Sequence, residues 1–221
     1  MSKHLLRFML LFVITGKAMA IEEPKYDVLL SEGQFEIRKY APKLIAEVIV
    51  EGDMDEASSK GFKLIANFIF GNNQAANQTS SEKIAMTAPV TVEPQSVKIA
   101  MTAPVTVEPQ SIGSSPTVNM ETATQWRVDF VMPSQYTLSS IPKPSNEAVK
   151  LKEIHSKSFV ALKYSGFNTV ARVQSKTLEV IAWASEKKLK VIGTPQLSRY
   201  DPPWTLPMFR RNEILIEVAS P

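Results

Sequence analysis

Side chains that could bind a metal ion are scarce in this chain of 221 residues. It has no cysteine and two histidines, of which His4 lies in an apolar N-terminal stretch and His155 in the polar segment EIHSKS. Thiolate and imidazole groups are common ligands of transition metals in proteins. A histidine in a polar turn is more often solvated than metal-bound. We therefore predict no metal site, with His155 as the one weak candidate.

Catalytic motifs are equally scarce. We find no nucleophile in a recognisable motif with a histidine, no glycine-rich phosphate loop, no HExxH and no dinucleotide fingerprint. Three carboxylates, Glu36, Glu47 and Glu213, could meet at the mouth of a barrel and act as acid and base. A buried carboxylate with a perturbed pKa in a closed cavity would favour such a role. We expect no enzyme, and a small-molecule hydrolase stays open as the less favoured alternative.

The segment YDPPWTLPMFRR at residues 200–211 gathers aromatic, proline and arginine residues. Its prolines fix the backbone and predict a rigid turn, in which Trp204 either caps the core or lines a cleft. Arg210 and Arg211 could bind an anionic group, because guanidinium forks suit carboxylates and phosphates. They could equally pair with internal acids or backbone carbonyls, and Arg38 has the same ambiguity.

The first twenty residues are typical of a secretory signal peptide. Basic residues precede a short apolar run at 8–14, and Ala18-Met19-Ala20 supplies a cleavage site, which predicts a mature chain from Ile21 in the periplasm or outside the cell. The run is too short to span a bilayer, so no stable membrane anchor is expected after cleavage. Removing Lys3, Arg7 and Lys17 leaves 22 basic residues against 22 acidic ones, which gives no reason to expect a nucleic-acid partner.

Hydrophobic periodicity predicts the elements of the first half, about 26–132. Two β-type segments, Tyr26 to Tyr40 and Leu44 to Glu51, read as a hairpin. Asp53 is placed to cap a helix that Gly71 ends, and Trp126 to Met132 alternates as a strand. The predicted buried stripe of this helix consists of Ala57, Gly61, Leu64, Ile65 and Phe68.

The second half, about 149–218, repeats that plan. Val149 to Ile154 and Phe159 to Tyr164 are predicted to pair around His155 to Ser158. Asn168 or Thr169 caps a helix that runs to about Lys190, and Glu213 to Val218 forms the closing strand. The predicted buried stripe of this helix consists of Val173, Leu178, Ile181, Ala184 and Leu189.

Together the halves predict one α+β domain over residues 21–221. Two pseudo-repeated ββαββ halves form a distorted, mostly antiparallel β-barrel with two helices on its outside, so that each apolar face has a partner. We expect this barrel to enclose an apolar recess.

A duplication complicates the sheet. The segment KIAMTAPVTVEPQS occurs at residues 83–96 and again, unchanged, at 98–111. Either copy could form the strand that follows the first helix, while the other is looped out. We favour a second arrangement, in which the copies pair as an antiparallel hairpin through Glu93 to Val97.

Five collinear stretches resemble the SOUL, or haem-binding protein, family. They are FEIRKY at 35–40, FIFG at 68–71, KIAMTAPV at 83–90, VDFVMPSQYTL at 128–138 and RYDPPWTLPMFRRNEILIEV at 199–218. The resemblance identifies the chain as a bacterial, exported member. It implies a distorted antiparallel barrel flanked by two helices, which the order of elements also predicts.

The resemblance implies tetrapyrrole binding, although the family's recognised contacts are missing here. One branch has a histidine after EIR, where this chain has Lys39; another has lysines near the propionates, at positions matching Asn67 and close to Leu206. We therefore expect weak binding of haem, another tetrapyrrole or a hydrophobic small molecule, without a histidine axial ligand and not required for folding. The alternative is a periplasmic interaction module whose partner docks on 202–209, and the oligomeric state stays open. The site is predicted on the first helix and the loop 203–209, at Phe62, Phe68, Trp204, Met208, Phe209 and Arg210.

Overall fold

The computed structural model describes residues 21–76, 80–95, 120 and 122–219. The predicted signal peptide and the second copy of the duplicated segment lie outside these residues. None of the helices described there is long and apolar enough to cross a membrane. The elements, in chain order, are β1 (Tyr26–Glu32), β2 (Phe35–Tyr40), β3 (Lys43–Glu51), α1 (Met54–Ile69), β4 (Asn73–Gln74), β5 (Val90–Pro94), β6 (Gln125–Val131), β7 (Lys143–Pro144), β8 (Lys150–Ile154), β9 (Lys157–Tyr164), α2 (Val170–Glu186), β10 (Gln196–Arg199), the 3₁₀ turn η1 (Pro207–Phe209) and β11 (Asn212–Val218).

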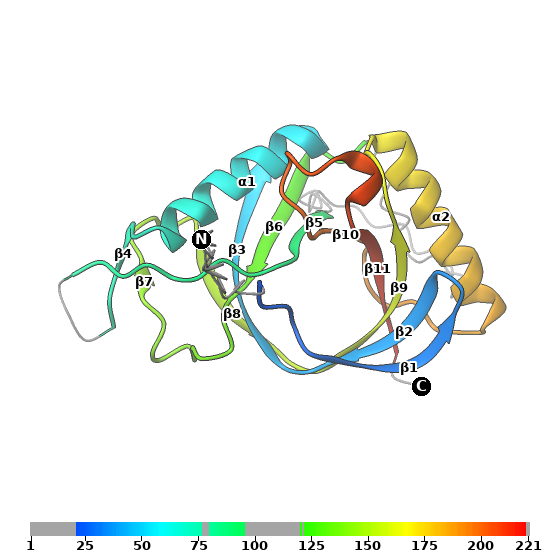
Figure 1. Cartoon of the computed structure of the whole chain (residues 1–221), viewed down its shortest axis with the longest axis horizontal. Helices are drawn as coiled ribbons and strands as arrows, with labels where there is room; N and C mark the ends of the chain where they lie inside the picture. Colours follow the sequence, from blue (N-terminus) through cyan, green and yellow to red (C-terminus); the bar gives the residue numbers. More distant parts are fainter. Residues whose placement is uncertain (1–20, 77–79, 96–119, 121, 220–221) are drawn as a thin grey trace, which may run out of the picture.

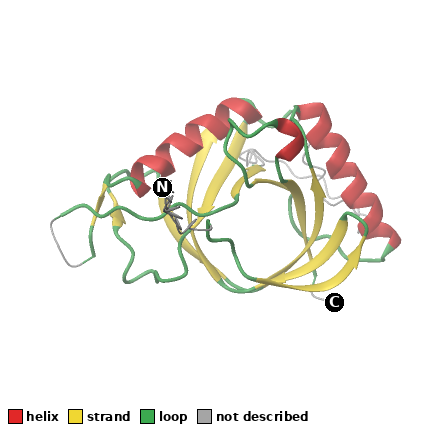
Figure 2. Ribbon diagram, in the orientation of Figure 1, coloured by secondary structure: helices red, strands yellow, loops and turns green. Residues whose placement is uncertain are grey.

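One curled antiparallel sheet with two helices on its outer side forms the body of the molecule, which confirms the predicted fold (Figures 1 and 2). The strand order is β1-β2-β9-β11-β10-β5-β6-β3-β8. Within it, β3-β6-β5 of the first half mirrors β9-β11-β10 of the second, and the halves meet where β5 pairs with β10. The two ββαββ halves are therefore related by a pseudo-twofold through that pair.

The two predicted hairpins are wrong. β2 pairs with β1 and β9, whereas β3 pairs with β6 and β8, so neither β2 and β3 nor β8 and β9 pair with each other. A two-residue hairpin turn needs positive φ, and Gly33 supplies it (φ 60) between β1 and β2. The links at 41–42 and 155–156 contain no positive-φ residue. At each link the backbone therefore bends and continues into the next strand without reversing. Two long bent strands, 35–51 and 150–164, thus run side by side.

Both helices begin at the predicted caps. The carboxylate of Asp53 accepts hydrogen bonds from the backbone N–H groups of Asp55 (3.0 Å) and Glu56 (2.8 Å), and Thr169 caps α2. Four of the five residues predicted for the α1 stripe are buried, Leu64 being half-buried. In α2 the prediction of Leu178 is wrong, because it is exposed. The stripe of α2 instead follows Val173, Thr177, Val180 and Ala184, which recur every three or four residues on one face.

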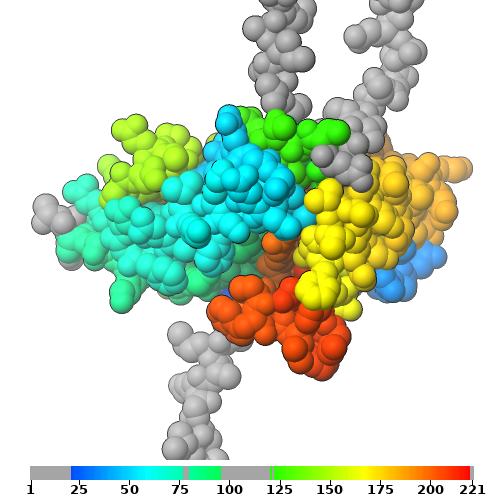
Figure 3. Space-filling model, turned by 90° about the horizontal axis from the view of Figure 1, so that it is seen from above, coloured from blue at the N-terminus to red at the C-terminus, as the bar shows by residue number. Residues whose placement is uncertain are grey.

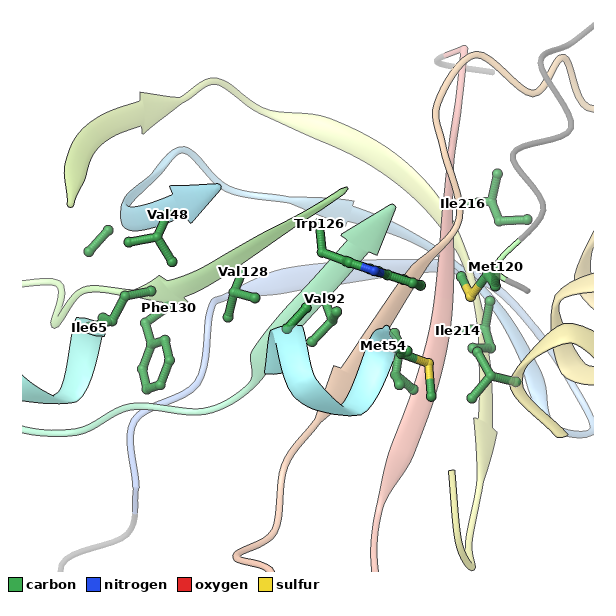
Figure 4. Close-up of a cluster of buried hydrophobic side chains, with 14 of the residues drawn as sticks. Val48, Met54, Ile65, Val92, Met120, Trp126, Val128, Phe130, Ile214 and Ile216 are labelled. Carbon is green, nitrogen blue, oxygen red and sulfur yellow. The ribbon is translucent and has the colours of Figure 1, made fainter. Parts of the chain in front are cut away.

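The main core lies between the helices and the outer face of the sheet. Figure 4 shows side chains from α1, such as Met54 and Ile65, together with Trp126, Val128 and Phe130 of β6. Gly61 permits this contact, since a Cβ there would lie 2.5 Å from the side chain of Val128. On the other half, Phe35 stacks on Trp183 of α2 with ring centroids 5.1 Å apart.

The first copy of the duplicated segment forms β5. Its residues Val90–Pro94 pair with β6 on one side, and 90–92 pair with β10 on the other. Because both edges of this stretch are occupied, the copies cannot pair with each other there, and the predicted hairpin between them is wrong for these residues. β5 lies at the centre of the sheet and carries the fully buried Val92.

Candidate functional site

The loop between β10 and β11 presents large apolar side chains to solvent. Trp204 is 82% exposed and Phe209 is 72% exposed, and Leu206 and Met208 are also exposed. Phe167, just before α2, joins them because Gly166 donates a backbone hydrogen bond to the carbonyl oxygen of Pro207 (2.8 Å). We call these five residues the apolar platform. Figure 3 shows the loop, in orange-red, protruding beside α1 and α2.

Polar contacts within the loop hold the platform in shape. The guanidinium of Arg210 donates from Nε to the carbonyl oxygen of Thr205 (2.7 Å) and from Nη2 to that of Pro203. It also lies over the Phe167 ring, 5.7 Å from the centroid. Asp201 accepts from the backbone N–H of Arg211 (2.6 Å). The prediction that Arg210 contacts a ligand therefore has to be corrected: its side chain braces the loop through backbone carbonyls.

Helix α1 contributes little to the predicted site. Phe68 is only 1% exposed and belongs to the core, so its assignment to a ligand wall is wrong. It falls on the same face as Ala57, Gly61 and Ile65, which all pack on the sheet. Phe62 is 40% exposed, but its ring packs against Phe130 with centroids 5.6 Å apart. Trp204, Met208 and Phe209 remain as exposed apolar residues of the predicted set.

Two platform residues were missed by the sequence argument. Leu206 was considered only as a position close to which one branch of the family has a lysine that this chain lacks. Phe167 lies some forty positions before the loop. Nothing in the sequence pattern links Phe167 to the loop, because the hydrogen bond between Gly166 and Pro207 is a tertiary contact.

His155 is exposed in the link between β8 and β9. This link belongs to the lower part of the sheet in Figure 1, whereas η1 and its loop lie at the top. In the part of the chain that the structure describes, no three His, Asp or Glu side chains are grouped to hold a metal ion. His155 is therefore not positioned to ligate a metal centre on the platform.

The inner face of the sheet, which we define as the face turned away from α1 and α2, carries buried charges beside a small apolar cluster that includes Tyr40 and Phe159, where an apolar recess was expected. Arg38, fully buried, donates to both carboxylate oxygens of Glu213 (2.6 and 3.1 Å) and to Glu36 (2.7 Å). Tyr200 also donates to Glu213 (2.8 Å), and burial raises the pKa of the Tyr200 phenol. Burial opposes ionisation of Glu36, but hydrogen bonds from Lys163 and Arg38 outweigh it and lower the pKa of its carboxyl.

The three candidate catalytic carboxylates do not meet. Glu36 and Glu213 share Arg38, while Glu47 lies on β3 and forms an ion pair with Lys152. A different acid has the perturbed pKa that would favour catalysis. Burial raises the pKa of Glu93 to about 7 against the opposing charge of Arg127. Glu93 accepts hydrogen bonds from Arg127 and from Gln196 (3.0 Å), so its carboxylate is bound within the sheet.

These features define an α+β protein of two ββαββ halves with an exposed apolar platform at one end. The chain belongs to the SOUL heme-binding protein family, whose model matches residues 21–98 and 93–217. The two matched segments overlap within the duplicated region.

Solved structures share the fold at low sequence identity. The C-terminal domain of EcmrR aligns with a TM-score of 0.55 and 11% identity, over 85% of this chain and 98% of that one. A hydrolase from Listeria innocua aligns with a TM-score of 0.50 and 11% identity, over 86% of this chain and 94% of that one. No curated protein sequence matches the chain. At such identities the similarity concerns the fold alone.

Proposed function

We propose that this protein is an exported, non-enzymatic SOUL-family member that weakly binds a tetrapyrrole or another flat hydrophobic molecule on the apolar platform, without a histidine axial ligand. The observation that carries the proposal is the exposure of Trp204, Met208 and Phe209 in a loop already fixed by Arg210. Aromatic rings gain stacking energy with flat ligands, and a fixed loop avoids the entropy cost of ordering on binding.

The family description supports a tetrapyrrole as the ligand class. The exposed position of His155, far along the sheet from η1, supports binding through the porphyrin face and edge instead of the iron. Export is proposed from the leader sequence at 1–20.

A hemin titration followed by the Soret band tests this proposal. Weak, saturable binding without the sharp band of a strongly ligated iron is expected. Phe209→Ala should weaken it by about three- to tenfold, as expected for one lost aromatic contact. Phe70→Ala is the matched control, because Phe70 is 58% exposed at the far end of α1. His155→Ala should leave binding unchanged, and a complex lost in that variant would contradict the proposal.

A second function is favoured by one observation: the platform protrudes from the surface (Figure 3). Protruding apolar groups also suit a protein partner, because exposed apolar patches commonly mark interaction sites. In that case hemin would cause no saturable change in wild-type protein, and the platform variants would instead lose the partner.

A further inference from the structure

The methionines of the described residues differ sharply in exposure. Met208 is 65% exposed. The others are buried or half-buried: Met54 (1% exposed), Met120 (2%), Met132 (3%) and the half-buried Met86. A dissolved oxidant therefore reaches the sulfur of Met208 more readily than the sulfur of any of these four. Because Met208 belongs to the apolar platform, a change at its sulfur is a change in the surface of the platform.

The composition of the chain directs two-electron oxidants to methionine. The chain contains no cysteine, so the thiolates that peroxides ordinarily attack are absent. Hydrogen peroxide converts a methionine thioether to the sulfoxide: the sulfur bonds one oxygen atom, the O–O bond breaks, and the other oxygen leaves as water. The sulfur is thereby oxidised by two electrons and the peroxide is reduced by two. Export, as proposed above, places the protein outside the thiol-rich cytoplasm.

The fold does not depend on the Met208 side chain. Met208 lies in η1, whose backbone is held by hydrogen bonds from the N–H of Phe209 to the carbonyl oxygen of Leu206 (2.9 Å) and from the N–H of Arg210 to that of Pro207 (3.1 Å). The Arg210 guanidinium fixes the rest of the loop through backbone carbonyls. None of these contacts uses the methionine sulfur, and Met208 belongs to neither cluster of core residues. Oxidation at this position should therefore leave the fold in place.

A sulfoxide makes this part of the surface polar. The thioether of methionine is an apolar, polarisable group that packs well against aromatic rings. The oxygen of the sulfoxide instead accepts hydrogen bonds from water. Covering that oxygen with a flat apolar ligand removes the water and supplies no donor in its place, which is unfavourable.

We propose that Met208 is a reversible oxidation switch of the apolar platform: the thioether form binds apolar molecules, and the sulfoxide form releases them. The effect of the switch on tetrapyrrole binding rests on the proposed function, whereas its effect on the apolarity of the surface does not. Methionine sulfoxide reductases reverse the switch, because two thiol groups supply two electrons and become a disulfide while the oxygen leaves as water.

Peroxide treatment, followed by peptide mass spectrometry and two binding measurements, tests this proposal. The mature chain is oxidised with hydrogen peroxide, freed of peroxide and compared with untreated protein. Met208 should be oxidised at least about tenfold faster than the buried Met54, Met120 and Met132. Affinity for gallium protoporphyrin IX should fall about five- to tenfold. Retention on a phenyl column, which measures the apolar surface without any tetrapyrrole, should shorten.

Reversal and stability separate a switch from oxidative damage. Reductases for both sulfoxide epimers, supplied with dithiothreitol, should restore affinity and retention. The thermal unfolding midpoint of the oxidised protein should equal that of the untreated protein.

Two variants identify the sulfur responsible. Met208→Leu keeps an apolar side chain that peroxide does not oxidise, so treated and untreated samples of this variant should show equal affinity and equal retention. Met86→Leu is the matched control, because Met86 lies outside the platform, and this variant should respond to peroxide as the wild type does. Both variants keep every other methionine, including Met101, which lies outside the described residues.

Four results would overturn the proposal: oxidation of Met208 no faster than that of the buried methionines, unchanged retention of the oxidised wild type, a lowered unfolding midpoint, or a response of Met208→Leu equal to that of the wild type. If untreated wild-type protein binds no gallium protoporphyrin IX, the proposed function fails, and the phenyl column still decides whether the switch exists.

Discussion

Arg38 and Glu213 form the ion pair most deeply enclosed in the described part of the molecule, since both side chains have no exposed area. The sequence left open whether Arg38 binds a ligand or an internal acid, and the structure places it with Glu213, Glu36 and Tyr40. The FEIRKY stretch is thus tied to the closing strand β11 across β9. This contact has a structural role that joins the two halves.

Replacing Arg38 by Met should lower the free energy of unfolding by about 3–5 kcal/mol, because Glu213 is left as a buried charge without its partner. Lys60→Met, which breaks an exposed pair with Glu56, should cost less than about 1 kcal/mol. Urea unfolding curves of both variants measure the difference. Equal effects of the two changes would show that the buried pair is not important for stability.

Glu93 should make stability depend on pH. Its pKa in the folded protein is about 7, above the ordinary value of 4.5, because burial disfavours the charged form. Between these values the folded state binds a proton that the unfolded state has released, so stability falls as pH rises from about 4.5 to 7. Urea unfolding at pH 5 and pH 8 should show that loss in the wild type and a smaller one in Glu93→Gln. If stability depends on pH in Glu93→Gln as it does in the wild type, groups other than Glu93 cause that dependence.

For the helices and strands, local sequence signals predicted the helix starts correctly, whereas the pairing of strands was predicted less well. Asp53 and Thr169 could be recognised as helix caps because a cap depends on the next three residues. Leu178 was misplaced because it lies five positions after Val173, about 140° around the helix from it, and so falls off the face that Val173, Val180 and Ala184 share. The continuous bends at 41–42 and 155–156 were misread as turns, since a two-residue break in a β pattern also fits a hairpin.

The duplication gives a test at the same scale. Val92 of β5 is fully buried between β6 and β10, so Val92→Asp should destabilise the protein by several kcal/mol. Val107 is the identical position of the second copy, and Val107→Asp should leave the unfolding midpoint unchanged. Thermal unfolding followed by circular dichroism compares them. A tolerated Val92→Asp would show that the second copy can replace the first in the sheet.

For the whole molecule, the pseudo-twofold could be inferred from the repeated order of elements, because each half shows the same strand and helix periodicities. The platform could be inferred only in part. Its loop residues are adjacent in sequence, whereas Phe167 comes from the other side of a tertiary contact. Phe68 was assigned both to the buried stripe of its helix and to the site, and only the buried assignment, which followed from helical periodicity, is correct. The charged inner face was anticipated in part: Glu36, Glu47 and Glu213 were placed at a barrel mouth and Arg38 was a candidate for pairing with internal acids, but the partners of each charge depend on tertiary contacts.

The binding surface that we propose lies outside the sheet. The main core is packed between the helices and the outer face, and the inner face carries ion pairs and a small apolar cluster. A pocket of about 170 Å³ lined by residues 22–25 and 41–44 is too small for a tetrapyrrole. We therefore propose that a flat hydrophobic ligand binds at the surface, on the apolar platform.

The most direct test is ¹H–¹⁵N NMR of the three tryptophan indoles during titration with gallium protoporphyrin IX, a diamagnetic haem analogue. Trp126 and Trp183 are 1% and 7% exposed, and Trp204 is 82% exposed. The account predicts a saturable shift of the Trp204 indole signal while the signals of Trp126 and Trp183 stay in place. A saturating titration that leaves Trp204 unmoved, or that shifts only the two buried indoles, would contradict it.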